Sequence, residues 1–191
     1  MSTTPPTPDY ELVDTIVLTE PAQVRALGDP LRNTILGLLH ERAATVTELA
    51  AAVKRPKGTV AHHVNVLVEA GLLRVVRTRR VRAIDERFYG RTARMFYVGS
   101  GQSAGSDPLP LDFNDFEVAA RESAGAYQAH QLWAFIRHAR LSEQEAAEFW
   151  LRIKDLVQEF DRVPRSGDTT YGFAVGIYPI TDYPTLPAET D

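Results

Sequence analysis

Residues 57–73 read Lys-Gly-Thr-Val-Ala-His-His-Val-Asn-Val-Leu-Val-Glu-Ala-Gly-Leu-Leu, and this stretch decides the fold. At about 100° per residue, Val60, Val64 and Leu67 share one face of a helix that runs to about Ala70. The opposite face is short and polar, and Gly71 stands where a glycine commonly ends a helix. The stretch therefore predicts a helix that buries one face and leaves the other free for a partner.

Further helix signals precede this stretch, and a hairpin pattern follows it. Thr19 is placed to cap a short helix ending near Gly28, Asp29-Pro30 starts a second helix that ends near Arg42, and a third follows Thr47. Strand-like runs at residues 72–78 and 84–91, joined by a turn at 79–83, predict a β-hairpin. This order predicts a mainly α fold with a small β-hairpin, a winged helix-turn-helix, over residues 20–98.

The charge of the chain is divided unevenly. The net charge is -4, yet residues 21–98 carry 14 Lys and Arg against 6 Asp and Glu, while the remaining residues carry 7 and 19. A basic module between acidic flanks is typical of a protein that docks one face on phosphate. The alternative is a solvated basic surface.

The outward helix face and the hairpin tip supply side chains suited to DNA. Asn can bond adenine through two atoms, Thr and His can bond a base or a phosphate, and arginines at a hairpin tip can reach an adjacent groove. His63 is ambiguous, because it lies at the edge of the buried face and suits packing as well as a phosphate. The expected DNA-contacting residues are Lys57, Gly58, Thr59, Ala61, His62, His63, Asn65, Arg79, Arg80 and Arg82.

Residues 20–98 also resemble the ArsR-like winged helix-turn-helix regulators. The resemblance is carried by residues 26–36 (ALGDPLRNTIL), 46–50 (VTELA), 58–67 (GTVAHHVNVL) and 69–73 (EAGLL), which follow at the family's spacing. It implies a homodimer with the arginine-rich turn as its wing. It also implies that five residues face DNA: Lys57, Thr59, Ala61, His62 and Asn65.

Metal sensing and catalysis are not expected. Metal-sensing members of that family place cysteines in the third helix, and this chain has no cysteine. His130 and His138 do not make a four-ligand set by themselves. The sequence has no Gly-rich phosphate loop, nucleophile elbow or His-Glu-x-x-His pattern, so we expect no catalytic residue and no cofactor.

The rest of the chain divides by composition into a flexible arm at residues 1–19, a linker at 99–112, a helical region at 113–180 and a flexible tail at 181–191. Within the arm, residues 10–18 alternate loosely and could form a short strand or an extended segment. In the helical region, Asn114 or Asp115 caps a helix reaching about Arg140, and Ser142 with Glu145 forms a capping box for another. Residues 171–180 predict a final strand. The aromatic side chains of the two predicted helices suit either a dimerisation core or an apolar effector pocket.

These observations predict a sequence-specific regulator of transcription that binds double-stranded DNA as a homodimer, with repression as its output. A small-molecule effector is possible in this scheme, and its identity is unknown. A winged-helix module that binds protein instead of DNA is the alternative, although apolar anchors would then be expected where His62 and Asn65 stand. No apolar run is long enough to span a membrane, and the N-terminus does not resemble a secretory signal, so we expect a cytoplasmic protein.

Overall fold

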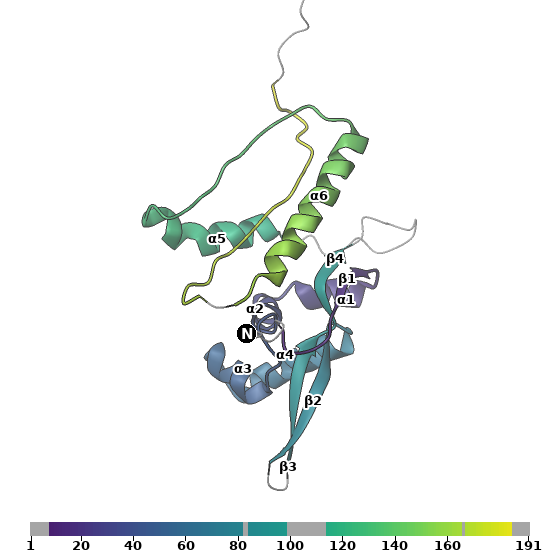
Figure 1. Cartoon of the computed structure of the whole chain (residues 1–191), viewed down its shortest axis with the longest axis vertical. Coiled ribbons are helices and arrows are strands. Elements are labelled where there is room, and N and C mark those ends of the chain that lie inside the picture. The colour runs from purple at the N-terminus through teal and green to yellow at the C-terminus, as the bar shows by residue number, and fades with distance from the viewer. Residues whose placement is uncertain (1–7, 82–83, 99–113, 166, 185–191) are drawn as a thin grey trace, which may run out of the picture.

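A computed structural model describes residues 8–81, 84–98, 114–165 and 167–184 (Figure 1). It confirms a mainly helical fold with a small β-hairpin. The elements in chain order are β1 (Val13–Leu18), α1 (Pro21–Leu27), α2 (Pro30–Leu38), α3 (Val46–Ala52), α4 (Lys57–Glu69), β2 (Leu73–Val81), β3 (Ile84–Arg91), β4 (Ala93–Val98), α5 (Asp115–Gln128) and α6 (Glu143–Arg162).

The helix boundaries follow the capping signals, with two shifts. Glu20 rather than Thr19 occupies the cap position of α1. The Asp29 side chain accepts a hydrogen bond from the Arg32 amide at 2.9 Å, as expected for the cap of α2. Helix α3 starts two residues earlier than expected, because Thr45 rather than Thr47 forms a capping box with Glu48. Gly71 has a φ of +72°, which a glycine adopts without strain, and it turns the chain from α4 into β2.

One hydrophobic core holds the winged helix-turn-helix together. Helices α1 to α4 and the base of the hairpin surround it, and its fully buried side chains include Ile35, Leu39, Leu49, Val60, Val64, Leu67, Leu72 and Leu73. Because α2, α3 and β2 contribute to the same core, the position of α4 relative to the hairpin is fixed by packing.

The hairpin contains a β-bulge that decides which side chains share a face. Strand β2 pairs antiparallel with β3, with Val75 opposite Tyr89 and Arg77 opposite Phe88, so Val76 is the extra residue. Leu73 and Tyr89 pack on the helical core. The face of the hairpin that carries them is called the helix-side face below, and the opposite face, which carries Phe88, the outer face.

The N-terminal segment is docked in the part that the structure describes, and of the two interpretations of residues 10–18 the structure contains the short strand. Residues 1–7 of the expected flexible arm lie outside the described residues. Strand β1 pairs in parallel with β4, from Val13 opposite Ala93 to Leu18 opposite Val98. Ahead of β1, the Tyr10 hydroxyl donates to the Leu39 carbonyl and accepts from the Arg91 amide at 3.1 Å. These partners are distant in sequence, so composition alone did not reveal them.

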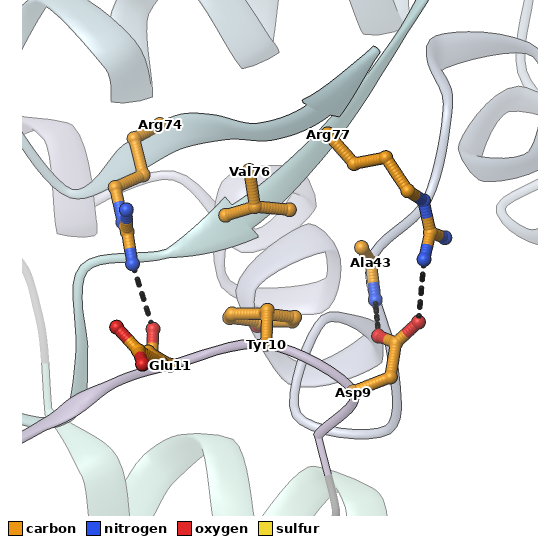
Figure 2. Close-up of a pocket in the computed structure, with 7 residues that line it drawn as sticks. All are labelled: Asp9, Tyr10, Glu11, Ala43, Arg74, Val76 and Arg77. Atoms are coloured by element: carbon orange, nitrogen blue, oxygen red, sulfur yellow. Dashed lines mark hydrogen bonds and ion pairs between the residues drawn. The ribbon is translucent and has the colours of Figure 1, made fainter. Parts of the chain in front are cut away.

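The residues before β1 lie on the outer face of the hairpin, as Figure 2 shows. The Asp9 carboxylate accepts from the Ala43 amide at 2.7 Å and from Arg77 at 3.2 Å, and Arg74 donates to the Glu11 carbonyl at 2.8 Å. A cavity of about 340 Å³ lies between this segment and β2. The segment therefore covers the base of the outer face.

Arg91 joins three parts of the domain from a buried position. Its guanidinium donates to the carbonyls of Ala93, Leu36 and Arg94 at 2.9, 3.0 and 2.8 Å. It also lies 4.7 Å from the centre of the Phe96 ring. Burial lowers the pKa of Arg91 to about 10, so the side chain stays charged near neutral pH and is held by carbonyl dipoles.

The C-terminal region differs from the expectation in two places. Helix α5 ends at Gln128 instead of at about residue 140. Two residues after this end, His130 adopts a φ of +57°. Residues 171–180 form no strand, because within the described residues no other strand pairs with them. They run instead beside both helices, with Phe173 5.0 Å from Phe160 and Tyr178 5.7 Å from Phe116 between ring centres (Figure 1). The expected capping box of Ser142 and Glu145 is present at the start of α6.

The C-terminal region has no core of its own within the described residues. Neither α5 nor α6 contains a buried side chain. Trp133 is 90% exposed, Phe135 82% and Tyr127 71%. The end of α6 contacts the winged domain, where Asp14 in β1 lies 2.8 Å from Arg162 and 3.8 Å from Arg94. The expected linker at residues 99–112 lies outside the described residues, as do residues 185–191 of the expected tail.

Candidate nucleic-acid interface

Helix α4 divides its surface between the core and solvent. Val60, Val64 and Leu67 are each 0% exposed. Ala61 is half-buried, and the exposed residues on the other side include Lys57, Gly58, Thr59, His62 and Asn65. The structure thus brings six of the seven expected helix residues together at the N-terminal part of one helix.

The N-terminus of α4 is open to a ligand. Pro56 occupies the cap position and makes no side-chain hydrogen bond to the first turn. The amides of that turn carry the positive end of the helix dipole, and Lys57 is exposed beside them. This arrangement suits a phosphate oxygen.

His63 lies apart from this group. Its side chain is 15% exposed, and its Nδ1 atom lies 3.6 Å from an Asp29 carboxylate oxygen, too far for a hydrogen bond. The ring packs against the start of α2 and contacts the His62 ring edge-on at 5.6 Å. Of the two interpretations of His63 from the sequence, the position of the side chain favours packing.

The arginines of the hairpin occupy different environments. Arg79 donates to Glu86 at 2.8 Å. Arg80 is exposed, and no ion pair or hydrogen bond joins it to another described residue. Arg82 lies outside the described residues. Arg79 and Arg80, the two expected wing cations that the structure describes, are therefore not equivalent.

One exposed cation of the hairpin was missed in the sequence. Arg87 lies on β3 opposite Thr78, and within the described part of the chain it has no ion pair or hydrogen bond either. It stands in the middle of a strand and not at the tip, so a search for arginines at the turn passed over it. The observed register, with Thr78 opposite Arg87 and Arg80 opposite Asp85, is what places it beside Arg80.

Two further surveys concern the described residues only. No three His, Asp or Glu side chains of that part lie close enough to hold a metal ion. None of its helices is both long and apolar enough to cross a bilayer.

Comparison with known proteins agrees with this geometry. A family model described as a helix-turn-helix domain matches residues 27–76. An uncharacterized HTH-type transcriptional regulator from Methanocaldococcus jannaschii is 39% identical over 51 residues, which are 26% of this chain and 57% of that protein. The chain thus spans little more than half the length of this relative.

Solved structures of regulators show a looser likeness. The transcriptional regulator HlyU from Vibrio vulnificus is 24% identical over 38% of this chain and 70% of its own, with a TM-score of 0.31. A homodimeric winged helix-turn-helix DNA-binding domain from Mycobacterium bovis, a possible ArsR-family regulator, is 19% identical over 62% of this chain and 86% of its own, with a TM-score of 0.33.

The assignment rests on the helix-turn-helix match and on the arrangement of the elements. Residues 27–76 hold the helices that the family model describes, and the hairpin of β2 and β3 follows them directly. The chain therefore contains a helix-turn-helix domain, and the hairpin that follows gives this domain the form of a winged helix-turn-helix.

Proposed function

We propose that this chain is a cytoplasmic, sequence-specific regulator of transcription that binds double-stranded DNA. The observation that carries the proposal is the divided surface of α4, with three fully buried valine and leucine side chains opposite exposed Thr59, His62 and Asn65. A polar helix face of this width suits the floor of a major groove. A protein-binding module would instead present apolar anchors there.

The roles of the helix residues follow from their chemistry and position. Asn65 offers an amide that bonds the N6 and N7 atoms of adenine together. Thr59 and Ala61 can contact a thymine methyl, and His62 can donate to a guanine or a phosphate. Lys57 and the amides at Gly58 hold a backbone phosphate, which fixes the register of the helix on DNA.

We further propose that the regulator is a homodimer whose C-terminal regions pair. Support comes from the exposed apolar side chains of this region, because a soluble monomer rarely leaves so many aromatic side chains in water. A two-fold dimer would place two copies of α4 in successive major grooves, so the operator would be an imperfect palindrome. Occlusion of a promoter, and hence repression, is the output that we propose.

An apolar effector pocket is the second use that we propose for the same aromatics. The ring pairs of Phe116 with Tyr178 and of Phe160 with Phe173 support it, because they lie between α5, α6 and the segment after α6. A ligand bound there would alter DNA affinity only through a difference in its affinity for two dimer arrangements.

DNA binding is tested by affinity selection of fragments from the source genome, followed by titration of a selected duplex and a random duplex. Asn65→Ala should weaken binding to the selected duplex by about 1 to 3 kcal/mol and leave binding to the random duplex nearly unchanged. Gln144→Ala is the control, because Gln144 is also an exposed helical amide and lies on α6. Equal losses on both duplexes would refute the base-reading role of Asn65, and no salt-dependent binding to any duplex would refute the function.

Dimerisation is tested by analytical ultracentrifugation of the full chain at micromolar concentration. The wild type should sediment as a dimer, and Trp133→Ser should shift it toward a monomer. Val75→Ser is the control, since Val75 is also exposed, at 41%, but belongs to the hairpin. A wild-type monomer at this concentration would contradict the proposed assembly.

A further inference from the structure

We infer that the wing meets DNA with its helix-side face alone, and that Arg87 together with Arg80 supplies the exposed cations of that face within the described part of the hairpin. Arg79, an equally basic residue one position before Arg80, then takes no part. This inference rests on the proposed function and specifies which residues of the wing carry it.

The strand register assigns the arginines to faces. Residues that pair across an antiparallel ladder project from the same side, and successive residues alternate. On β3, Arg87 and Asp85 lie two and four residues before Tyr89, so both project from the same face as Tyr89. Arg80 is opposite Asp85 and therefore shares this face with Arg87. Arg79 pairs with Glu86, which projects with Phe88 from the outer face.

The recognition helix lies on the helix-side face. Tyr89 and Leu73 pack against the core that includes Val60, Val64 and Leu67 of α4. The Arg91 guanidinium, on this face too, donates to the Leu36 carbonyl of α2. A duplex that receives α4 in its major groove therefore approaches the hairpin from the side of Arg80 and Arg87.

The arginines of the outer face are already engaged. Arg77 bonds Asp9 at 3.2 Å and lies 4.5 Å from the centre of the Phe88 ring. Arg79 bonds Glu86 at 2.8 Å and lies 5.4 Å from the same ring. Each has a carboxylate partner and covers an aromatic side chain that is only 6% exposed. Each of the two guanidinium groups therefore already has an anionic and an aromatic partner.

Arg80 and Arg87 stand in contrast. Both are exposed, and neither has an ion pair or hydrogen bond with another residue that the structure describes. Arg87 and the residue opposite Arg80 are two positions apart on β3, so the two arginines are diagonal neighbours on one face. Two adjacent cations that have no partner among the described residues match the two-sided phosphate lining of a minor groove.

The test measures the dissociation constant of the full chain for a selected operator duplex over a range of salt concentrations. Arg87→Gln and Arg80→Gln should each flatten the slope of log affinity against log salt by about one, and the double variant by about two. The matched control is the double variant Arg79→Gln with Glu86→Gln, which removes one arginine without leaving its carboxylate unpaired. It should keep the wild-type slope. Far-UV circular dichroism and the thermal midpoint show that each variant is folded.

The outcomes separate this inference from the function on which it rests. If the wild type binds DNA with a steep salt slope but Arg87→Gln leaves that slope unchanged, the inference is wrong and the function stands. The same holds if the control pair flattens the slope as much as Arg87→Gln does. If the wild type shows no salt-dependent binding, the proposed function and the inference fall together.

Discussion

Replacing Tyr10 with Phe removes one oxygen atom that joins the N-terminal segment to the winged domain. That oxygen donates to the carbonyl of Leu39 and accepts from the amide of Arg91. Leu39 is 0% exposed and Arg91 6%, so water does not readily replace the lost partner of either backbone group. An unpaired buried group costs about 1 to 3 kcal/mol, and two such groups give an expected loss of about 2 to 6 kcal/mol in the free energy of unfolding.

The measurement is urea denaturation followed by far-UV circular dichroism, with amide hydrogen exchange at Arg91 as the local readout. Tyr171→Phe is the control, because it removes the same hydroxyl from a side chain that is 68% exposed, and it should change the free energy by less than about 0.5 kcal/mol. If Tyr10→Phe behaves like this control and exchange at Arg91 stays slow, the segment is not docked. The flexible arm expected from composition would then be the better description.

Three more outcomes are expected. Gly90→Ala would place a methyl group 2.7 Å from the Tyr10 ring, so it should destabilise the fold by about 1 to 3 kcal/mol. The same substitution should cost less in a Tyr10→Ala background, and equal costs in the two backgrounds would contradict the contact. Thr45→Ala should lower the free energy of unfolding by about 1 kcal/mol, and Thr47→Ala, at an exposed position, by less than half of that. The reverse order in thermal melts would mean that the cap of α3 was assigned wrongly. Burial, with the nearby positive charges of Arg91, Arg165 and Arg94, lowers the His40 pKa from 6.5 to about 3. Below pH 6.5 the unfolded state binds a proton at His40 that the folded state does not bind. The free energy of unfolding therefore falls with falling pH, by at most about 1.4 kcal/mol per pH unit. His40→Gln should flatten that fall between pH 7.5 and 5.5 in urea titrations.

Local signals in the sequence were sufficient for the helix-turn-helix. The 3.6-residue period of Val60, Val64 and Leu67, the cap at Asp29 and the glycine at position 71 each specify a conformation within a few residues of themselves. The structure contains all of them. The same residues also placed the polar face of α4, because burial of one face determines which side chains point away.

Which face of the hairpin each arginine occupies could not be predicted from the alternation of side chains along a regular strand. A regular strand from Leu73 to Arg80 would place Arg77 and Arg79 on the helix side, with Leu73 and Val75. The bulge at Val76 reverses this assignment for every residue beyond it, so Arg80 replaces Arg79 on the helix-side face. The residue type at position 76 does not indicate a bulge, and the bulge is evident only from the pairing of β2 with β3.

Long-range contacts account for the remaining differences. Tyr10 bonds residues 29 and 81 positions away, and neither partner is visible in the composition of the first nineteen residues. Residues 131–141 have good helix propensity, but most helical stability comes from burying an apolar face. Trp133 and Phe135 find no such burial within the described chain, and α5 ends at Gln128.

The exposed aromatics of the C-terminal region have a consequence for how the protein matures. On the proposed assembly, α5 and α6 obtain their apolar core only when two chains meet, so the free energy that orders them depends on protein concentration. The winged domain, with its own buried core, folds without that requirement. Newly made chains at low abundance would then hold a formed recognition helix but lack the pairing that sets the distance between two half-sites. Occupancy of an operator would rise with the square of chain concentration at low levels, and the regulator would respond steeply to its own supply.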